Sequence, residues 1–115
     1  MRHEMPNLPA PQAHELAAVI DRLVAALQPH RMYVFGSQAR GDAGLESDVD
    51  MLVVVQKAEQ PSHRLAQTAY HAAAPHSLAL DIVVISREEF EWRSRALASL
   101  PAIVLREGRL VYATP

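Results

Sequence analysis

Two aspartates one residue apart, Asp48 and Asp50, are the side chains of this sequence best suited to perform chemistry. They open the apolar run at residues 51–55, which is typical of a buried β-strand. Residues i and i+2 of a strand point to the same face, so their Cβ atoms would lie roughly 6.5 Å apart. That separation lets two carboxylates bind one divalent cation, and the pair therefore predicts a Mg²⁺ site.

A Gly-Ser turn lies upstream of the aspartates. Gly36 and Ser37 end the apolar run at residues 32–35, and the backbone N–H groups of such a turn can bind a phosphate. We expect a short helix to begin near Ser37 and to run through about Arg40. A Gly-Ser pair alone is more often an ordinary strand-to-helix turn, but together with the aspartates it predicts a metal–nucleotide site.

A third carboxylate, Asp81, lies within the apolar run at residues 78–85. A buried charge there is costly unless it is paired or binds a metal. If this strand neighbours the strand at residues 49–55, Asp81 faces Asp48 and Asp50, and one or two Mg²⁺ ions would relieve their mutual repulsion. Two such ions can stabilise the attacking and leaving oxygens of a phosphoryl transfer, and Asp81 could also act as the base.

Helices and strands alternate along the chain that positions these residues. Amphipathic periodicity and capping residues predict helices at residues 12–28, 61–74, from 86 and at 99–108. The apolar stripe of the second helix includes Tyr70, and the third helix begins with a capping box at residues 86–89. Apolar runs predict strands at residues 32–35, 49–55, 78–85 and 109–112. The strand at 49–55 is apolar on both faces and should not be an exposed edge. The order predicts an α/β (α+β) fold with a mixed sheet of about four strands covered by helices.

The composition indicates one globular domain, residues 12–115, after a flexible N-terminal arm, residues 1–11, that is rich in proline. The sequence has no cysteine, which excludes disulfides and thiolate metal sites. Its net charge of -2 offers no basic field for direct nucleic acid binding. No run is apolar and long enough for a membrane span or a signal peptide, so we expect a cytoplasmic protein.

The ordered set of motifs resembles the DNA polymerase β-type nucleotidyltransferases. The motifs are Gly36-Ser37-x-Ala39-Arg40-Gly41, Ser47-Asp48-x-Asp50 and Asp81 in a later strand. The small size resembles the prokaryotic minimal nucleotidyltransferases, or MNT proteins, and residues 106–112 are similar to the end of many of them. The resemblance implies the nucleotidyltransferase fold and catalysis by three aspartates that bind Mg²⁺, with Asp81 a metal ligand or base.

The resemblance also implies a nucleotide site. Gly36 and Ser37 would hold the triphosphate of ATP, Arg40 would lie near a phosphate, and Ser47 would assist through its hydroxyl. From the residues alone, Arg40 could equally be a solvated arginine and Ser47 a plain turn residue.

MNT proteins are often antitoxins of HEPN ribonucleases, and the family is thought to transfer AMP from ATP to a toxin tyrosine. The resemblance therefore implies a Mg²⁺-dependent nucleotidyltransferase that modifies a HEPN toxin. Nearly all of the chain is needed to build the sheet and its helices, which favours an acceptor on another protein or a site completed by a second subunit. Two alternatives stay open: a non-catalytic antitoxin that neutralises its partner by occlusion, and an aminoglycoside-type small-molecule nucleotidyltransferase.

The remaining candidates are weaker. None of the six histidines has a convincing metal-ligand spacing. Arg64 and His71 have the Arg-x6-His spacing of HEPN nucleases, which we interpret as coincidence because the chain is not all-helical. Phe90, Trp92 and Leu97 could belong to the core or form an exposed patch for a partner.

Overall fold

The computed structural model describes residues 10–36 and 48–114 of the chain. Over these residues, helices and strands follow the predicted order. The elements are α1 (Ala10–Leu27), β1 (Arg31–Phe35), β2 (Val49–Val55), α3 (Ser62–Ala73), β3 (Leu80–Ser86), α4 (Arg87–Arg93), α5 (Leu100–Glu107) and β4 (Arg109–Ala113). Of the arm predicted at residues 1–11, residues 10 and 11 instead belong to α1, and residues 1–9 lie outside the described residues, as does the short helix expected near Ser37.

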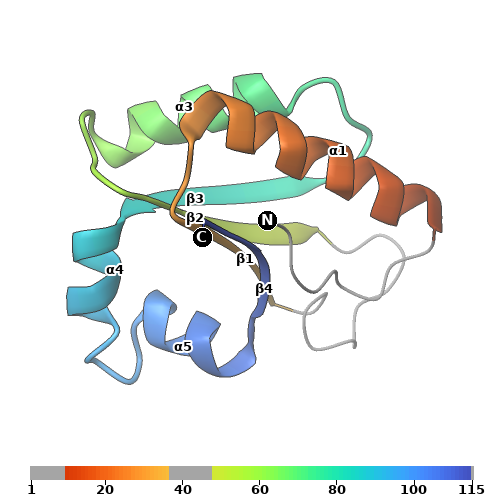
Figure 1. Cartoon of the computed structure of the whole chain (residues 1–115). Helices are drawn as coiled ribbons and strands as arrows, with labels where there is room; N and C mark the ends of the chain where they lie inside the picture. The colour runs from red at the N-terminus through yellow and green to blue at the C-terminus, as the bar shows by residue number, and fades with distance from the viewer. Residues whose placement is uncertain (1–9, 37–47, 115) are drawn as a thin grey trace.

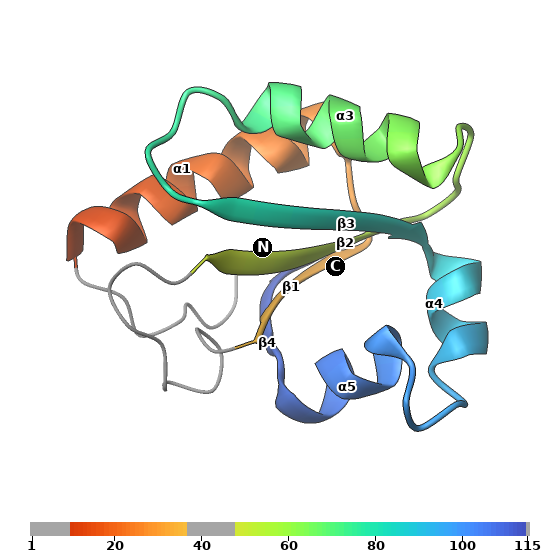
Figure 2. The same ribbon diagram turned by 180° about the vertical axis from the view of Figure 1, so that it is seen from behind.

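The strands form one mixed sheet in the order β3-β2-β1-β4, which confirms the predicted fold class. β1 is antiparallel to both β2 and β4, whereas β2 and β3 are parallel. β2 lies inside the sheet, as its apolar sequence predicted, and all its residues except Asp50 are buried. α1 and α3 lie on one side of the sheet, and α4 and α5 lie on the other (Figures 1 and 2).

The alternation of side chains along β2 divides the core into two layers. Met51 and Val53 point toward α1 and α3 and pack with Leu16, Ile20 and Leu23. Leu52 and Val54 point the other way and pack with residues that include Tyr33, Ile85, Phe90 and Val104. Asp50 has the same parity as Leu52, so its side chain belongs to the α4/α5 face of the sheet.

Serine caps begin the two C-terminal helices where the sequence predicted them. Ser86 Oγ accepts a hydrogen bond from the Glu89 N–H (3.0 Å), and Ser99 Oγ accepts one from the Ala102 N–H (3.2 Å). Each bond satisfies a backbone donor that has no partner within its helix. The Glu89 carboxylate, the other half of the predicted capping box, instead forms an ion pair with Arg93 (3.3 Å).

The three apolar side chains whose position the sequence left open differ in burial. Phe90 is in the core and stacks on Tyr33 with ring centroids 5.6 Å apart. Trp92 and Leu97 are 68% and 79% exposed. Among the described helices, none is both long enough and apolar enough to cross a membrane.

Candidate functional site

The three predicted aspartates lie at the same end of the sheet. β1 ends there at Phe35, and the parallel strands β2 and β3 both begin there. Asp48 directly precedes β2, Asp50 is its second residue, and Asp81 is the second residue of β3. Asp50 pairs with Phe35 on one side and with Asp81 on the other. The prediction that the two strands are neighbours is therefore confirmed, and it makes Asp50 and Asp81 adjacent on the same face.

The three carboxylates differ in burial, and the difference corrects one prediction. A burial cost for Asp81 was expected from its apolar sequence neighbours, but this residue, near the start of the edge strand β3, is exposed, although Ile82, Val84 and Ile85 further along the strand are buried. Asp50, on the internal strand, is half-buried. Burial raises the pKa of Asp50, and the negative charges of Asp81 and Asp48 raise it further. Negative charge thus concentrates around Asp50, which is the condition that a bound cation relieves.

Gly36 fits this site for two reasons. Its φ of +75° lies in the left-handed region, which residues other than glycine rarely adopt. A Cβ atom at this position would also overlap the Oδ2 atom of Asp50. Only glycine therefore lets the turn after β1 lie directly against the half-buried carboxylate.

Tyr70 is a member of the site that the sequence did not reveal. The periodicity of α3 placed it in the apolar stripe, but it is 40% exposed and its hydroxyl reaches the edge of β3. There the hydroxyl accepts a hydrogen bond from the Ile82 N–H (2.8 Å) and donates one to Asp81 Oδ1 (3.4 Å). The signal in the sequence is a tyrosine on the apolar stripe of a helix. Such a tyrosine is expected to be buried or half-buried, and its hydroxyl then usually has a polar partner.

Two side chains of α1 hold the connection that leads into β3. The Glu15 carboxylate accepts hydrogen bonds from the Ser77 N–H and from the Ser77 hydroxyl, and these bonds lower the pKa of Glu15. Arg22 Nη2 donates to the carbonyl oxygens of Ala73 (2.7 Å) and Pro75 (2.9 Å). The start of β3, and with it Asp81, is thereby tied to the helix layer.

The donor set suits a divalent cation in type and charge, since hard cations such as Mg²⁺ prefer carboxylate oxygens. Burial, and after it the negative charges of Asp81 and Asp48, raise the pKa of Asp50, and a bound cation would favour its charged form. In the described part of the chain, however, no three acidic or histidine side chains converge as closely as a metal site requires. The strand register brings Asp50 and Asp81 together, but the Asp81 carboxylate contacts Tyr70. Three predicted nucleotide contacts, Ser37, Arg40 and Ser47, lie outside the described residues.

Comparison with known families gives one match across most of the chain. The family described as nucleotidyltransferase domain matches residues 16–111, a range that contains Gly36 and all three aspartates.

A candidate protein adenylyltransferase of Methanocaldococcus jannaschii is 43% identical to the chain over 54 residues. The match covers 47% of this chain and 52% of that protein, so the chain spans about half the length of this relative.

Two solved structures share the fold. One, a candidate nucleotidyltransferase from Sulfolobus solfataricus, has a TM-score of 0.60 at 17% identity and covers 84% of this chain and 76% of its own. The other is a toxin–antitoxin structure with AMP-PNP, which has a TM-score of 0.51 at 24% identity and covers 84% of this chain and 72% of its own. At these identities the similarity shows the four-stranded fold with its helices.

Proposed function

The chain belongs to the nucleotidyltransferase domain family, and we propose that it transfers AMP from ATP to a hydroxyl group. The reaction would take place at the end of the sheet where Asp48, Asp50 and Asp81 lie. The observation that carries the proposal is the pairing of Asp50 with Asp81 across two parallel strands, with Gly36 against the same carboxylate. Strand ends position carboxylates more rigidly than loops do, as catalysis requires.

Each residue has a role that follows from its position and chemistry. The turn that begins at Gly36 would bind the triphosphate through backbone N–H groups, with Ser37, Arg40 and Ser47 as further contacts by their place in the sequence. The three aspartates would hold one or two Mg²⁺ ions. When bound, Mg²⁺ would neutralise their charge and stabilise the charge that develops on the phosphate oxygens.

Asp81 is the candidate base because it is exposed, already contacts a hydroxyl, and lies beside Asp50. Its carboxylate would take the proton from the acceptor hydroxyl, whose oxygen then forms a bond to the α-phosphorus of ATP. The bond from the α-phosphorus to the bridging oxygen breaks, and pyrophosphate leaves with that oxygen.

We further propose that the acceptor is a tyrosine of a HEPN-family toxin, and that the chain acts as its antitoxin. Two similarities support this acceptor: a relative bears the name of a candidate protein adenylyltransferase, and a structural neighbour is a toxin–antitoxin structure with AMP-PNP. The exposure of Asp48 and Asp81 also suits an acceptor that arrives on another protein.

The direct test is to incubate the chain with Mg²⁺, α-labelled ATP and the protein encoded beside it, and to follow the acceptor by intact mass. We expect the acceptor to gain AMP units, and we expect Asp50→Asn to abolish the gain. Glu59→Gln is the matched control, since it also removes one carboxylate but from an exposed position after β2. Undiminished transfer by Asp50→Asn would refute the assigned centre.

Occlusion is a second candidate function, favoured by the exposed Trp92 and Leu97 around the end of α4. An Asp50→Asn variant that binds and still silences the toxin would support occlusion. A variant that binds the toxin but leaves it active would support catalysis.

A further inference from the structure

A cavity of about 420 Å³ lies on the α4/α5 face, toward the other end of the sheet from the aspartates. Its wall includes Arg31 and Val54, which pair with one another at the start of β1 and near the end of β2. Asp50 pairs with Phe35, four residues further along β1, which corresponds to about 13 Å at 3.3 Å per residue. The cavity is therefore separate from the proposed catalytic centre.

Positive charge converges on this cavity from three places in the chain. Arg31 comes from β1, Arg87 is the first residue of α4, and Arg95 follows α4. Glu91 is the carboxylate among the lining residues, so the lining has a formal charge of +2 with His30 neutral. This local charge stands out in a chain whose net charge is -2. Arg31 lies more than 50 residues before Arg87 and Arg95 in the sequence, and the fold brings it to the two arginines of the α4 region.

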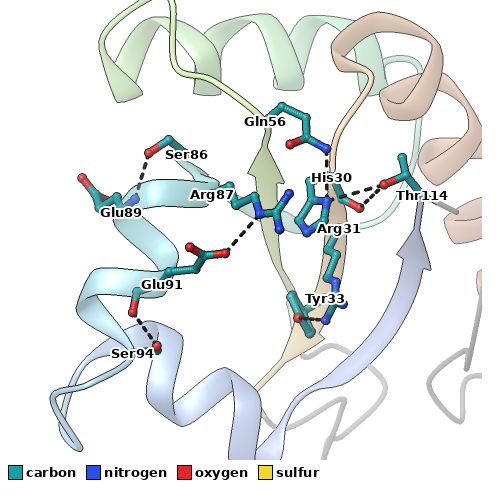
Figure 3. Close-up of polar contacts among 10 residues, drawn as sticks. All are labelled: His30, Arg31, Tyr33, Gln56, Ser86, Arg87, Glu89, Glu91, Ser94 and Thr114. Carbon is teal, nitrogen blue, oxygen red and sulfur yellow. Dashed lines mark hydrogen bonds and ion pairs between the residues drawn. The ribbon is translucent and has the colours of Figure 1, made fainter.

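Two of the arginines in the lining have hydrogen-bond partners, which Figure 3 shows, and all three are exposed and accessible to a ligand. Arg87 Nε donates to Glu91 Oε1 (3.1 Å), and Arg31 Nη1 donates to the Tyr33 hydroxyl (3.5 Å). Each bond uses one of the five N–H donors of a guanidinium and leaves the others available for a ligand. Burial lowers the pKa of His30, and the nearby charges of Arg87 and Arg31 lower it further.

Apolar side chains complete the lining. Val54 and Phe90 are buried and belong to the core layer beneath α4 and α5, whereas Leu105 is 53% exposed at the surface. A volume of this size, with apolar walls and a few charged groups, is typical of small-molecule sites. A nucleic acid backbone would instead need an extended basic track.

We propose that this cavity binds a small phosphate monoester, with the phosphate at Arg31 and Arg87 and the body of the molecule against Phe90 and Leu105. Guanidinium forks match the oxygen geometry of phosphate, and a dianion balances the +2 charge of the lining. A single carboxylate would leave part of that charge uncompensated. The site goes beyond the transfer reaction and does not depend on it.

The test is an NMR titration of the isotopically labelled full chain with phenyl phosphate, and with benzoate as a carboxylate of similar shape. We expect saturable shifts of the backbone signals of Arg31, Arg87 and Phe90, and affinity for phenyl phosphate at least about fivefold above that for benzoate. Arg31→Gln and Arg87→Gln should each weaken binding about tenfold, which is the effect of losing one charge-assisted hydrogen bond.

Two variants serve as controls. Arg93→Gln removes the same charge from the same helix but lies outside this cavity, and should leave affinity within about twofold. Glu91→Gln removes the carboxylate of the lining and should tighten binding. Each variant is first checked for an unchanged fold by its amide spectrum.

Four results would overturn the proposal. These are no saturable binding at millimolar phenyl phosphate, equal affinity for benzoate, equal weakening by Arg93→Gln, and shifts confined to Gly36, Asp48 and Asp50. The last result would place the anion at the proposed nucleotide site.

Discussion

Replacing Asp50 with asparagine should stabilise the protein in the absence of divalent cations. Most substitutions of half-buried residues are destabilising, so the sign of this prediction is unusual. It follows from the strand register, which sets the carboxylate of Asp50 beside that of Asp81, and from the burial that already disfavours its charge. Asparagine keeps the shape of the side chain and removes the charge.

The size of the effect follows from the sheet geometry. Paired residues on neighbouring strands lie about 4.8 Å apart, and carboxylates that diverge slightly lie about 6 Å apart. At that distance, repulsion amounts to about 0.7 kcal/mol in water and about 3 kcal/mol at an effective dielectric of about 20. Because Asp81 is exposed and salt screens its charge, we expect a gain of about 1 kcal/mol, or about 4 °C in Tm.

The pH dependence has a definite sign. A carboxyl group whose pKa is raised in the folded state binds more protons there than in the unfolded chain. The destabilisation by Asp50 is therefore fully present above its folded-state pKa, and it disappears as the pH falls toward the ordinary value of 3.8. The Tm difference between Asp50→Asn and the unchanged protein should be largest near neutral pH and should shrink on acidification.

Thermal unfolding, measured first with a chelator and then in millimolar Mg²⁺, tests how Asp50→Asn changes the Tm without and with the cation. In chelator, Asp50→Asn should unfold at the higher temperature, whereas Mg²⁺ should stabilise the unchanged protein more than the variant. Glu59→Gln, an exposed carboxylate outside the site, should change neither value. A lower Tm for Asp50→Asn in chelator, with Glu59→Gln unchanged, would refute the reasoning, because it would mean that Asp50 has a stabilising partner.

Three further substitutions test the packing around the site. Gly36→Ala should destabilise the fold by about 2 kcal/mol in chemical denaturation, because the new Cβ meets Asp50 in a left-handed turn; a neutral result would contradict that close contact. Tyr70→Phe should cost about 1 kcal/mol through the loss of its hydroxyl, and should lower the Mg²⁺ concentration needed for thermal stabilisation because Asp81 is released; an unchanged Mg²⁺ midpoint would refute this restraint. Phe90→Ala should cost about 3 kcal/mol, whereas Trp92→Ala should change stability by less than about 0.5 kcal/mol; similar losses would contradict their assigned burial.

Local patterns predicted the parts of the fold whose causes are local. The bounds of β2 match the prediction at both ends, and the caps at Ser86 and Ser99 were identified from short-range patterns alone. The exposure of Asp81 could not be predicted this way, since an apolar run does not reveal which of its residues the rest of the fold buries. The contact of Tyr70 with Asp81 depends likewise on how α3 crosses β3. The roles of Ser37, Arg40 and Ser47 as nucleotide contacts stay predictions from the sequence.

The unequal environments of Asp50 and Asp81 assign them different parts of one reaction. Asp50 is held by strands on both sides and by Gly36, so it has little freedom to move and suits a fixed ligand. Asp81 lies on an edge strand, is exposed, and accepts a hydrogen bond from the Tyr70 hydroxyl. In this position its carboxylate can exchange one hydroxyl partner for another. A tyrosine acceptor would present the same chemical group that Tyr70 now provides. An entering tyrosine that displaces Tyr70 from Asp81 would therefore come into contact with the candidate base, and Tyr70→Phe should lower the KM for a protein acceptor rather than change kcat.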